Sequence, residues 1–284
     1  MRKVLLPHTL EELWQVLNAE PQATVYAGGT DLLVKLRQGL VDSPCLVCLE
    51  RIEDLKGVRE HGHEVFIGAC SSHAALLGNP IIRSNFPVLT EALELLGSPA
   101  IRNMGTIGGN LCTASPAADS LPPFYVLDAE VEIWSRNTSR RMALKAFILG
   151  PGKTSLQPRE IVSGIWVRKA PGYNLHHFEK VGQRKALAIS IASLAALLRV
   201  SENGVIEEAR FAWGSVGPTI ITIPEVEKAL VGNRLSRPIL EKAACLARSA
   251  VEPIDDIRAS AKYRRLVSGN LMVRLLTHQR EGCH

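Results

Sequence analysis

The sequence carries two segments built around a glycine pair, Tyr26-Ala27-Gly28-Gly29-Thr30-Asp31 and Gly105-Thr106-Ile107-Gly108-Gly109-Asn110. Each lies beside an apolar run typical of a strand: Thr24–Ala27 precedes the first pair, and Leu111-Cys112 follows the second. Adjacent glycines lack a Cβ, tolerate positive φ and let main-chain N–H groups approach an anion closely. Together the two segments predict a diphosphate held from two sides by main-chain amides.

Short polar side chains follow both glycine pairs and are placed to add hydrogen bonds to such an anion: Thr30, Thr106, Asn110 and Ser115. Asp119 is a candidate acceptor for a ribose hydroxyl, although a turn cap before Pro122-Pro123 explains it equally well. The commoner nucleotide motifs are missing, because no G-x-G-x-x-G follows the first strand and no G-x-x-x-x-G-K-[ST] occurs. The glycine-rich stretch at 150–154 is therefore interpreted as a turn.

Composition places the chain among ordinary globular proteins, with 46% hydrophobic and 21% charged residues. The net charge of +5 is mild, and the cluster of Lys262, Arg264 and Arg265 is interpreted as a solvated helix face rather than a nucleic-acid patch. No apolar run is long enough to span a bilayer, and Met1-Arg2-Lys3 does not open a secretory leader. We therefore expect a cytoplasmic protein with no membrane span.

The six cysteines are spread along the chain, which favours reduced thiols in a cytosol. Cys45 and Cys48 have the spacing of metal ligands, but no second Cys/His pair completes a site. We expect Cys45–Leu49 to be a buried strand and predict no metal site. The cysteines also lack the four-ligand runs of iron–sulfur clusters, so no cluster is expected in this chain.

Periodicity predicts mixed α and β structure. A capping-box spacing of Thr9 and Glu12 begins a helix, and Asn203-Gly204 marks a hairpin. The long stretch from Gly97 to Gly109 is expected to be irregular. Strands are expected at 23–27, 46–49, 64–69, 131–134 and 161–167, and helices at 73–77, 88–96, 225–230, 239–250 and 259–277.

The segments Ala27–Leu32, Ile101–Asn110 and Ser115–Asp119 resemble the FAD-binding subunit of the molybdenum hydroxylases, the family of xanthine, nicotinate and aerobic carbon monoxide dehydrogenases. The resemblance extends over nearly the whole length. It implies an α+β chain with a two-lobed FAD-binding domain of the vanillyl-alcohol-oxidase/PCMH type at 1–170, with lobes at about 1–57 and 58–170. An α+β C-terminal domain with a small antiparallel sheet and helices is implied at 171–284.

The resemblance also implies roles for individual residues. The two glycine loops would wrap the FAD diphosphate and ribityl chain, and Asp119 would contact FAD. Val162 would pack near the isoalloxazine or adenine, Lys180 would lie near the flavin ring, and Leu96 would flank it. The expected cofactor-binding residues are Val25, Tyr26, Ala27, Gly28, Gly29, Thr30, Asp31, Leu32, Leu96, Thr106, Ile107, Gly108, Gly109, Asn110, Ser115, Asp119, Val162 and Lys180.

By the same resemblance, the chain is an oxidoreductase subunit that is active only in a complex. A [2Fe–2S] ferredoxin-like subunit and a molybdopterin-binding large subunit would be its partners, FAD its cofactor, and NAD⁺ or another molecule the acceptor. No catalytic acid or base, and no nucleic-acid partner, is expected. One departure is Ala188, where many members carry an aspartate.

Three alternatives remain open at this point. A self-sufficient flavin oxidoreductase of the vanillyl-alcohol-oxidase type would need its own substrate pocket, for which the C-terminal region is short and poor in aromatic residues. A nucleotide-binding scaffold without a redox role would be colourless. An α/β domain whose glycines only make turns would bind no flavin.

Overall fold

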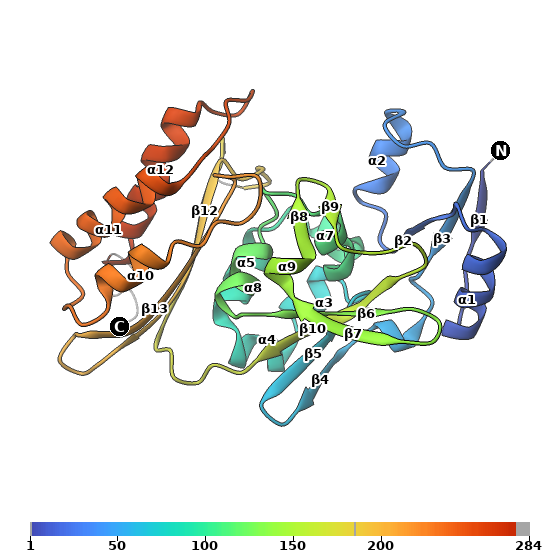
Figure 1. Cartoon of the computed structure of the whole chain (residues 1–284), viewed down its shortest axis with the longest axis horizontal. Coiled ribbons are helices and arrows are strands. Elements are labelled where there is room, and N and C mark those ends of the chain that lie inside the picture. Colours follow the sequence, from blue (N-terminus) through green and yellow to red (C-terminus); the bar gives the residue numbers. More distant parts are fainter. Residues whose placement is uncertain (1, 185, 277–284) are drawn as a thin grey trace. The chain divides into compact units, whose positions relative to one another are not determined.

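The computed structural model describes residues 2–184 and 186–276, and close contacts divide the chain into two compact units (Figure 1). Unit 1 comprises residues 1–81, 98–114 and 129–168. Unit 2 comprises residues 82–97, 115–128 and 169–284. The boundary near residue 170 that the sequence suggests stays a prediction about independently folding domains, since unit 2 also takes in two earlier segments.

Unit 1 begins with a parallel three-stranded sheet in the order β1-β3-β2. Helix α1 packs on it through Leu13, Trp14 and Leu17, which are buried with Val47. The Thr9 hydroxyl accepts from the Glu12 amide and caps α1, as the sequence predicts. The elements are β1 (Lys3–Leu5), α1 (Leu10–Ala19), β2 (Thr24–Tyr26), α2 (Leu32–Arg37), β3 (Cys45–Cys48) and a 3₁₀ turn (Glu53–Leu55).

The rest of unit 1 is an antiparallel sheet in the order β4-β5-β10-β6-β7, with a small β8–β9 pair. Strand β10 lies between β5 and β6 and is buried over most of its length. Its Val, Ile and Trp residues suit this central position. The elements are β4 (Val58–His61), β5 (Glu64–Gly68), α3 (His73–Leu77), α6 (Pro99–Met104), α7 (Ile107–Thr113), β6 (Glu130–Trp134), β7 (Ser139–Ala143), α9 (Leu144–Phe147), β8 (Ile148–Gly150), β9 (Lys153–Thr154) and β10 (Ile161–Arg168).

Unit 2 is built on an antiparallel sheet in the order β11-β12-β13. Helices α10, α11 and α12 cover one face (Figure 1), and α5 and α8 contact the strands as well. Strand β12 is therefore buried on both sides over most of its length, and its sequence is mainly apolar, interrupted by Ser193 and Arg199. The elements are α4 (Pro80–Asn85), α5 (Pro87–Leu95), α8 (Leu121–Val126), β11 (Leu175–Val181), β12 (Ala192–Val200), β13 (Ile206–Gly214), α10 (Pro224–Leu230), α11 (Arg237–Ala250) and α12 (Ala261–Val273).

Two sequence-based expectations about local structure are wrong. Leu111-Cys112 lies in helix α7 and not in a strand, because the Thr106 hydroxyl accepts from the Gly109 amide and starts a helix there. The stretch from Gly97 to Gly109 is not irregular, since the Ser98 hydroxyl caps α6 inside it. The predicted hairpin between β12 and β13 is confirmed, with Gly204 at φ +77°. The part of the expected last helix at Thr277 lies outside the described residues.

Arg264 also differs from expectation. It is 1% exposed on the inner side of α12, whereas Lys262 and Arg265 are exposed. The predicted solvated face is thus wrong for Arg264, whose guanidinium has fixed acceptors inside unit 2. In the described part of the chain, no helix is both long and apolar enough to cross a membrane.

Candidate functional site

The first glycine loop connects β2 to α2 in unit 1. Gly29 has φ +70°, a conformation that residues with a Cβ rarely adopt. Within the described residues, the main-chain amides of residues 28–32 donate no hydrogen bond. Consecutive open amides on a tight turn form a concave site for an anion. This loop therefore has the donor set that the sequence predicts for a diphosphate.

The second glycine loop differs from expectation because its amides are already used. Ile107 N donates to Ser71 O, Gly108 N to Ala69 O at 2.8 Å, and Asn110 N to Thr106 O. Gly108 is required for close approach and not for positive φ, because a Cβ there would lie 2.5 Å from the Ala69 Cβ. The expectation of bare amides on both sides is thus wrong for this loop.

The two loops are in direct contact within unit 1. A Cβ on Gly28 would lie 1.7 Å from the Met104 carbonyl oxygen, and one on Gly105 would lie 3.4 Å from Thr30 Oγ1. Thr113 Oγ1 donates to Asp31 Oδ2 at 3.1 Å, and the same oxygen accepts from Lys35 Nζ at 2.6 Å. At position 28 only glycine allows this approach, so Gly28 lets the first loop pack directly against the main chain of the second.

His73 lies beside this junction, a residue that sequence reasoning did not select. Its amide donates to Gly105 O, and its Cδ2 would lie 3.1 Å from a Cβ on Gly105. The imidazole is 3% exposed, and burial, together with the nearby positive charge of Arg102, lowers its pKa to about 4. His73 is therefore neutral at physiological pH, and its buried Nδ1 has no hydrogen-bond partner in the described structure.

Val162 lies in β10 on the other side of the second loop. It is buried beside an irregularity in the β6–β10 register. Ala69 connects the two regions, because its amide donates to Ser163 O while its carbonyl accepts from Gly108 N. The predicted residues 25–32, 106–110 and 162 thus belong to one continuous part of unit 1.

In unit 2 the structure brings together two predicted residues that are 61 positions apart in the sequence, Asp119 and Lys180. Lys180 Nζ lies 2.6 Å from Asp119 Oδ2, and their side chains are 7% and 9% exposed. Burial raises the pKa of Asp119 to about 6, and the ammonium of Lys180 opposes that rise. The other carboxylate oxygen, Oδ1, is buried without a hydrogen-bond partner among the described residues.

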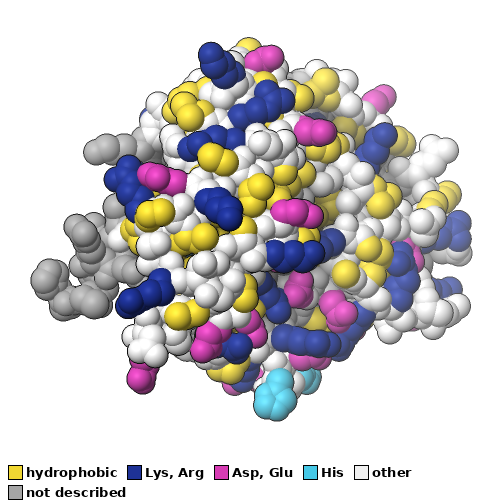
Figure 2. Space-filling model, turned by 60° about the vertical axis from the view of Figure 1, so that its left-hand side comes forward, with side chains coloured by type: hydrophobic (Ala, Val, Ile, Leu, Met, Phe, Trp, Pro, Cys, Tyr) yellow, Lys and Arg dark blue, Asp and Glu magenta, His cyan; other side chains and the backbone are white. Residues whose placement is uncertain are grey.

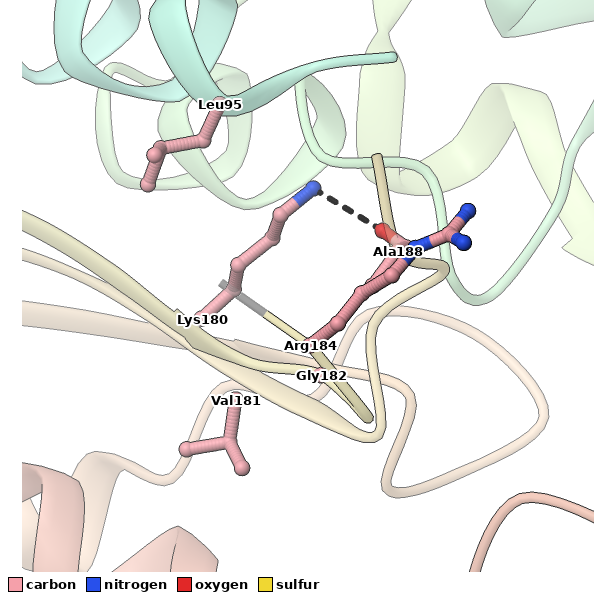
Figure 3. Close-up of a pocket in the computed structure, with 6 residues that line it drawn as sticks. All are labelled: Leu95, Lys180, Val181, Gly182, Arg184 and Ala188. Atoms are coloured by element: carbon pink, nitrogen blue, oxygen red, sulfur yellow. Dashed lines mark hydrogen bonds between the residues drawn. The ribbon is translucent and has the colours of Figure 1, made fainter. Parts of the chain in front are cut away.

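Lys180 also lines a cavity of about 370 Å³ in unit 2 (Figure 3). Its Nζ donates to the Ala188 carbonyl at 3.2 Å, so the segment after β11 folds back over the strand. Arg184 donates to Leu187 O at 2.6 Å, and Leu187 adopts φ +56°. The cavity has a cationic wall, and at position 188 it has a main-chain carbonyl and a methyl group.

A buried network anchors the same segment. Arg264 Nη1 donates to Ile191 O at 2.6 Å and to Ser215 O at 3.1 Å, while Nη2 donates to Asp256 Oδ1 at 2.7 Å. Arg258 donates to Asp256 and Ser190 O. Its guanidinium holds the pKa of the Asp256 carboxyl far below the usual range, with a further contribution from Arg264. The network therefore fixes the end of the cavity-lining segment.

The remaining predicted residues are less connected. Leu96 is buried at the end of α5, and the Ser115 hydroxyl accepts from Ala117 N in the turn after α7. Glu91, which the sequence did not suggest, accepts from Phe178 N at 2.6 Å, two residues before Lys180. Burial raises the pKa of Glu91 to about 7.

Nowhere in residues 2–184 and 186–276 do three His, Cys, Asp or Glu side chains gather as metal ligands.

Comparison with known proteins decides the family. Residues 1–168 match the family model for the FAD binding domain in molybdopterin dehydrogenase, and residues 177–279 match the CO dehydrogenase flavoprotein C-terminal domain. This chain belongs to the FAD-binding subunits of the molybdenum hydroxylases. It is an oxidoreductase subunit and its cofactor is FAD, which confirms the resemblance found in the motifs.

The similarity covers most of this chain and most of each relative. The nicotinate dehydrogenase FAD-subunit of Eubacterium barkeri is 30% identical, covering 98% of this chain and 97% of that protein. The carbon monoxide dehydrogenase medium chain of Afipia carboxidovorans is 32% identical, with 87% and 85% covered. A chain of quinoline 2-oxidoreductase from Pseudomonas putida superposes with a TM-score of 0.93 at 26% identity, covering 99% of this chain and 98% of that one. The expected α+β fold is thus confirmed.

Proposed function

We propose that this chain is the flavin-carrying electron relay of a molybdenum hydroxylase complex. In this role it receives electrons from the [2Fe–2S] clusters of a ferredoxin-like subunit and passes them to NAD⁺ or another acceptor. A molybdopterin-binding large subunit would oxidise the substrate. The names of two relatives support the role of one chain among several, since they are a "FAD-subunit" and a "medium chain". FAD supplies the exchange between one-electron and two-electron transfer.

The observation that carries this proposal is the row of open amides at residues 28–32, on a loop that glycine holds against Met104. Main-chain amides that point at an anion satisfy a diphosphate without a lysine. The second loop would contribute through the side chain of Asn110 and by supporting the first loop, because its own amides are engaged. The residues present therefore fit FAD.

In unit 2, Asp119 and Lys180 would contact FAD with different groups. Asp119 Oδ1 is a buried acceptor without a partner in the described structure, which suits a ribose hydroxyl. Lys180 provides a positive charge whose position is fixed by Asp119 and the Ala188 carbonyl. Leu96, Ser115 and Val162 would add packing and one hydroxyl. No residue of this chain is proposed as a catalytic acid or base.

The test is a comparison of the complete complex with one assembled without this chain. Substrate should reduce the iron–sulfur clusters in both assemblies. Reduction of NAD⁺ or of a dye acceptor should occur only when this chain is present and loaded with FAD. The FAD-loaded chain alone should oxidise no alcohol or phenol, which separates the relay from a self-sufficient oxidase. Equal acceptor reduction with and without the chain would rule the relay out.

A further inference from the structure

Helix α12 divides its side chains in an unusual way. Its inner side carries Arg264, Ser268 and Gly269, all buried, while Tyr263 and Leu266 are 44% and 50% exposed. A surface helix usually buries its apolar side chains and exposes its charged ones. Here an arginine is buried, and two large side chains, a tyrosine and a leucine, are exposed. Exposed apolar groups gathered in one place mark contact sites on protein surfaces.

The loop before α12 also carries exposed apolar side chains. Ile254 is 71% exposed and Ile257 is 100% exposed. The loop is nevertheless ordered by its acids: Asp255 Oδ1 accepts from Ala261 N at 2.7 Å, and Asp256 accepts from Arg258 and Arg264. Fixed side chains lose little conformational entropy when a partner covers them.

Two cations flank these apolar groups. Lys262 and Arg265 are exposed, and among the described residues neither has an acidic partner. Helix α12 itself contains no acidic residue. On the side of the molecule shown in Figure 2, hydrophobic, basic and acidic side chains are interspersed. We name Ile254, Ile257, Lys262, Tyr263, Arg265 and Leu266 the α12 face.

We propose that the α12 face is a docking surface for an acidic iron–sulfur partner subunit, an inference that rests on the proposed function. Tyrosine, arginine and isoleucine around a small apolar centre are typical of protein interfaces, and unpaired cations select a partner that presents carboxylates. The face is also connected to the cavity wall at Lys180. Arg258 donates to Ser190 O, and Gln183 Nε2 donates to Arg258 O at 3.3 Å.

That connection favours the electron donor over the other partners. Arg258, the residue after Ile257, donates to Ser190 O in the segment whose Ala188 carbonyl accepts from Lys180. A donor seated on the face would thus lie next to Arg258, which is hydrogen-bonded to the loop that lines the proposed flavin contact in unit 2. Carboxylates brought to Lys262 and Arg265 would steer association and make it sensitive to salt.

The experiment measures binding of the purified iron–sulfur subunit to the full FAD-loaded chain at low and high salt. The double variant K262E/R265E should raise Kd about tenfold or more, and added salt should weaken the wild type more than the variant. Its matched control is K228E/K242E, which makes the same charge change at exposed lysines of α10 and α11 and should keep Kd within about twofold. Ile257→Ser, at a fully exposed position, tests the apolar part.

FAD content and melting temperature should match the wild type in all of these variants, because each change is on an exposed side chain. Binding by K262E/R265E and Ile257→Ser as tight as by the control would overturn the surface while leaving the proposed function intact. The proposed docking surface would also be overturned if these variants lost only their binding to the large subunit, or only their self-association. A wild-type chain that never binds an iron–sulfur subunit would refute the proposed function and this surface together.

Discussion

Replacing Gly28 by alanine should weaken FAD binding strongly while leaving the rest of unit 1 folded. The new Cβ would lie 1.7 Å from the Met104 oxygen, 2.5 Å from its carbonyl carbon and 3.1 Å from Gly105 N. All three are main-chain atoms, so no rotamer change relieves the overlap. To reach even a tight contact of 3.0 Å, the two loops must separate by at least 1.3 Å.

Such a displacement moves the open amides away from the position that suits a diphosphate. Loss of one hydrogen bond to a charged group costs about 1.5–3 kcal/mol. That corresponds to an increase in the Kd for FAD of about 10- to 150-fold, and losing more than one amide gives a larger effect.

The assay is FAD titration of the purified full chain, followed by flavin fluorescence, with visible absorbance for retained flavin. Gly150→Ala is the matched control, because a Cβ at Gly150 would meet nothing within 4 Å and its φ is not positive. Circular dichroism should show folded protein in both variants. A Kd for Gly28→Ala within twofold of the Gly150→Ala value would refute the argument that this glycine sets the loop geometry.

Three further predictions concern buried charges. The pKa of Asp119 is raised from 3.8 to about 6, so its protonated form stabilises the fold at about pH 4 and this contribution is lost as the pH rises through 6. The unfolding free energy of the FAD-free wild type should therefore fall by about 3 kcal/mol between pH 4 and 7. Urea denaturation should show that Asp119→Asn lacks this decline. Arg264→Met should lower the unfolding free energy by about 3 kcal/mol or more, because it removes the guanidinium that donates to the carbonyls of Ile191 and Ser215 and one of the donors to Asp256. Arg265→Met on the exposed side should change it by less than about 0.5 kcal/mol, and equal effects of the two substitutions would contradict the network. Burial raises the pKa of Glu91 from 4.5 to about 7, so the stability of the fold falls as the pH rises through 7. Glu91→Gln keeps an acceptor for Phe178 N, and its melting temperature should exceed that of the wild type at pH 8 and equal it at pH 5. Equal melting temperatures at pH 8 would count against the raised pKa of Glu91.

Local patterns predicted much of this fold because their causes are local. The Thr9 cap of α1 and the Gly204 hairpin each depend on residues within a few positions. The first glycine loop is also a local signal, since Gly29 itself adopts the positive φ. The glycine pair in the sequence was therefore enough to predict that the main-chain amides of this loop are available to an anion.

The remaining features depend on partners far away in the sequence. The amides of the second loop are occupied by Ser71 and Ala69, which nothing near Gly108 reveals. The pairing of Asp119 with Lys180 needs β11 to lie beside the turn after α7, and a ribose acceptor could not be distinguished from a turn cap before that was seen. Arg264 reads as a surface arginine until its acceptors on Ile191 and Ser215 are located.

The most direct test of the relay is anaerobic rapid mixing of the FAD-loaded chain with its reduced iron–sulfur subunit, followed by the visible absorbance of the flavin. The account predicts that the flavin absorbance bleaches as the clusters are reoxidised, and that the same chain stripped of FAD leaves the clusters reduced. Clusters that stay reduced beside a fully loaded wild-type flavin would contradict it.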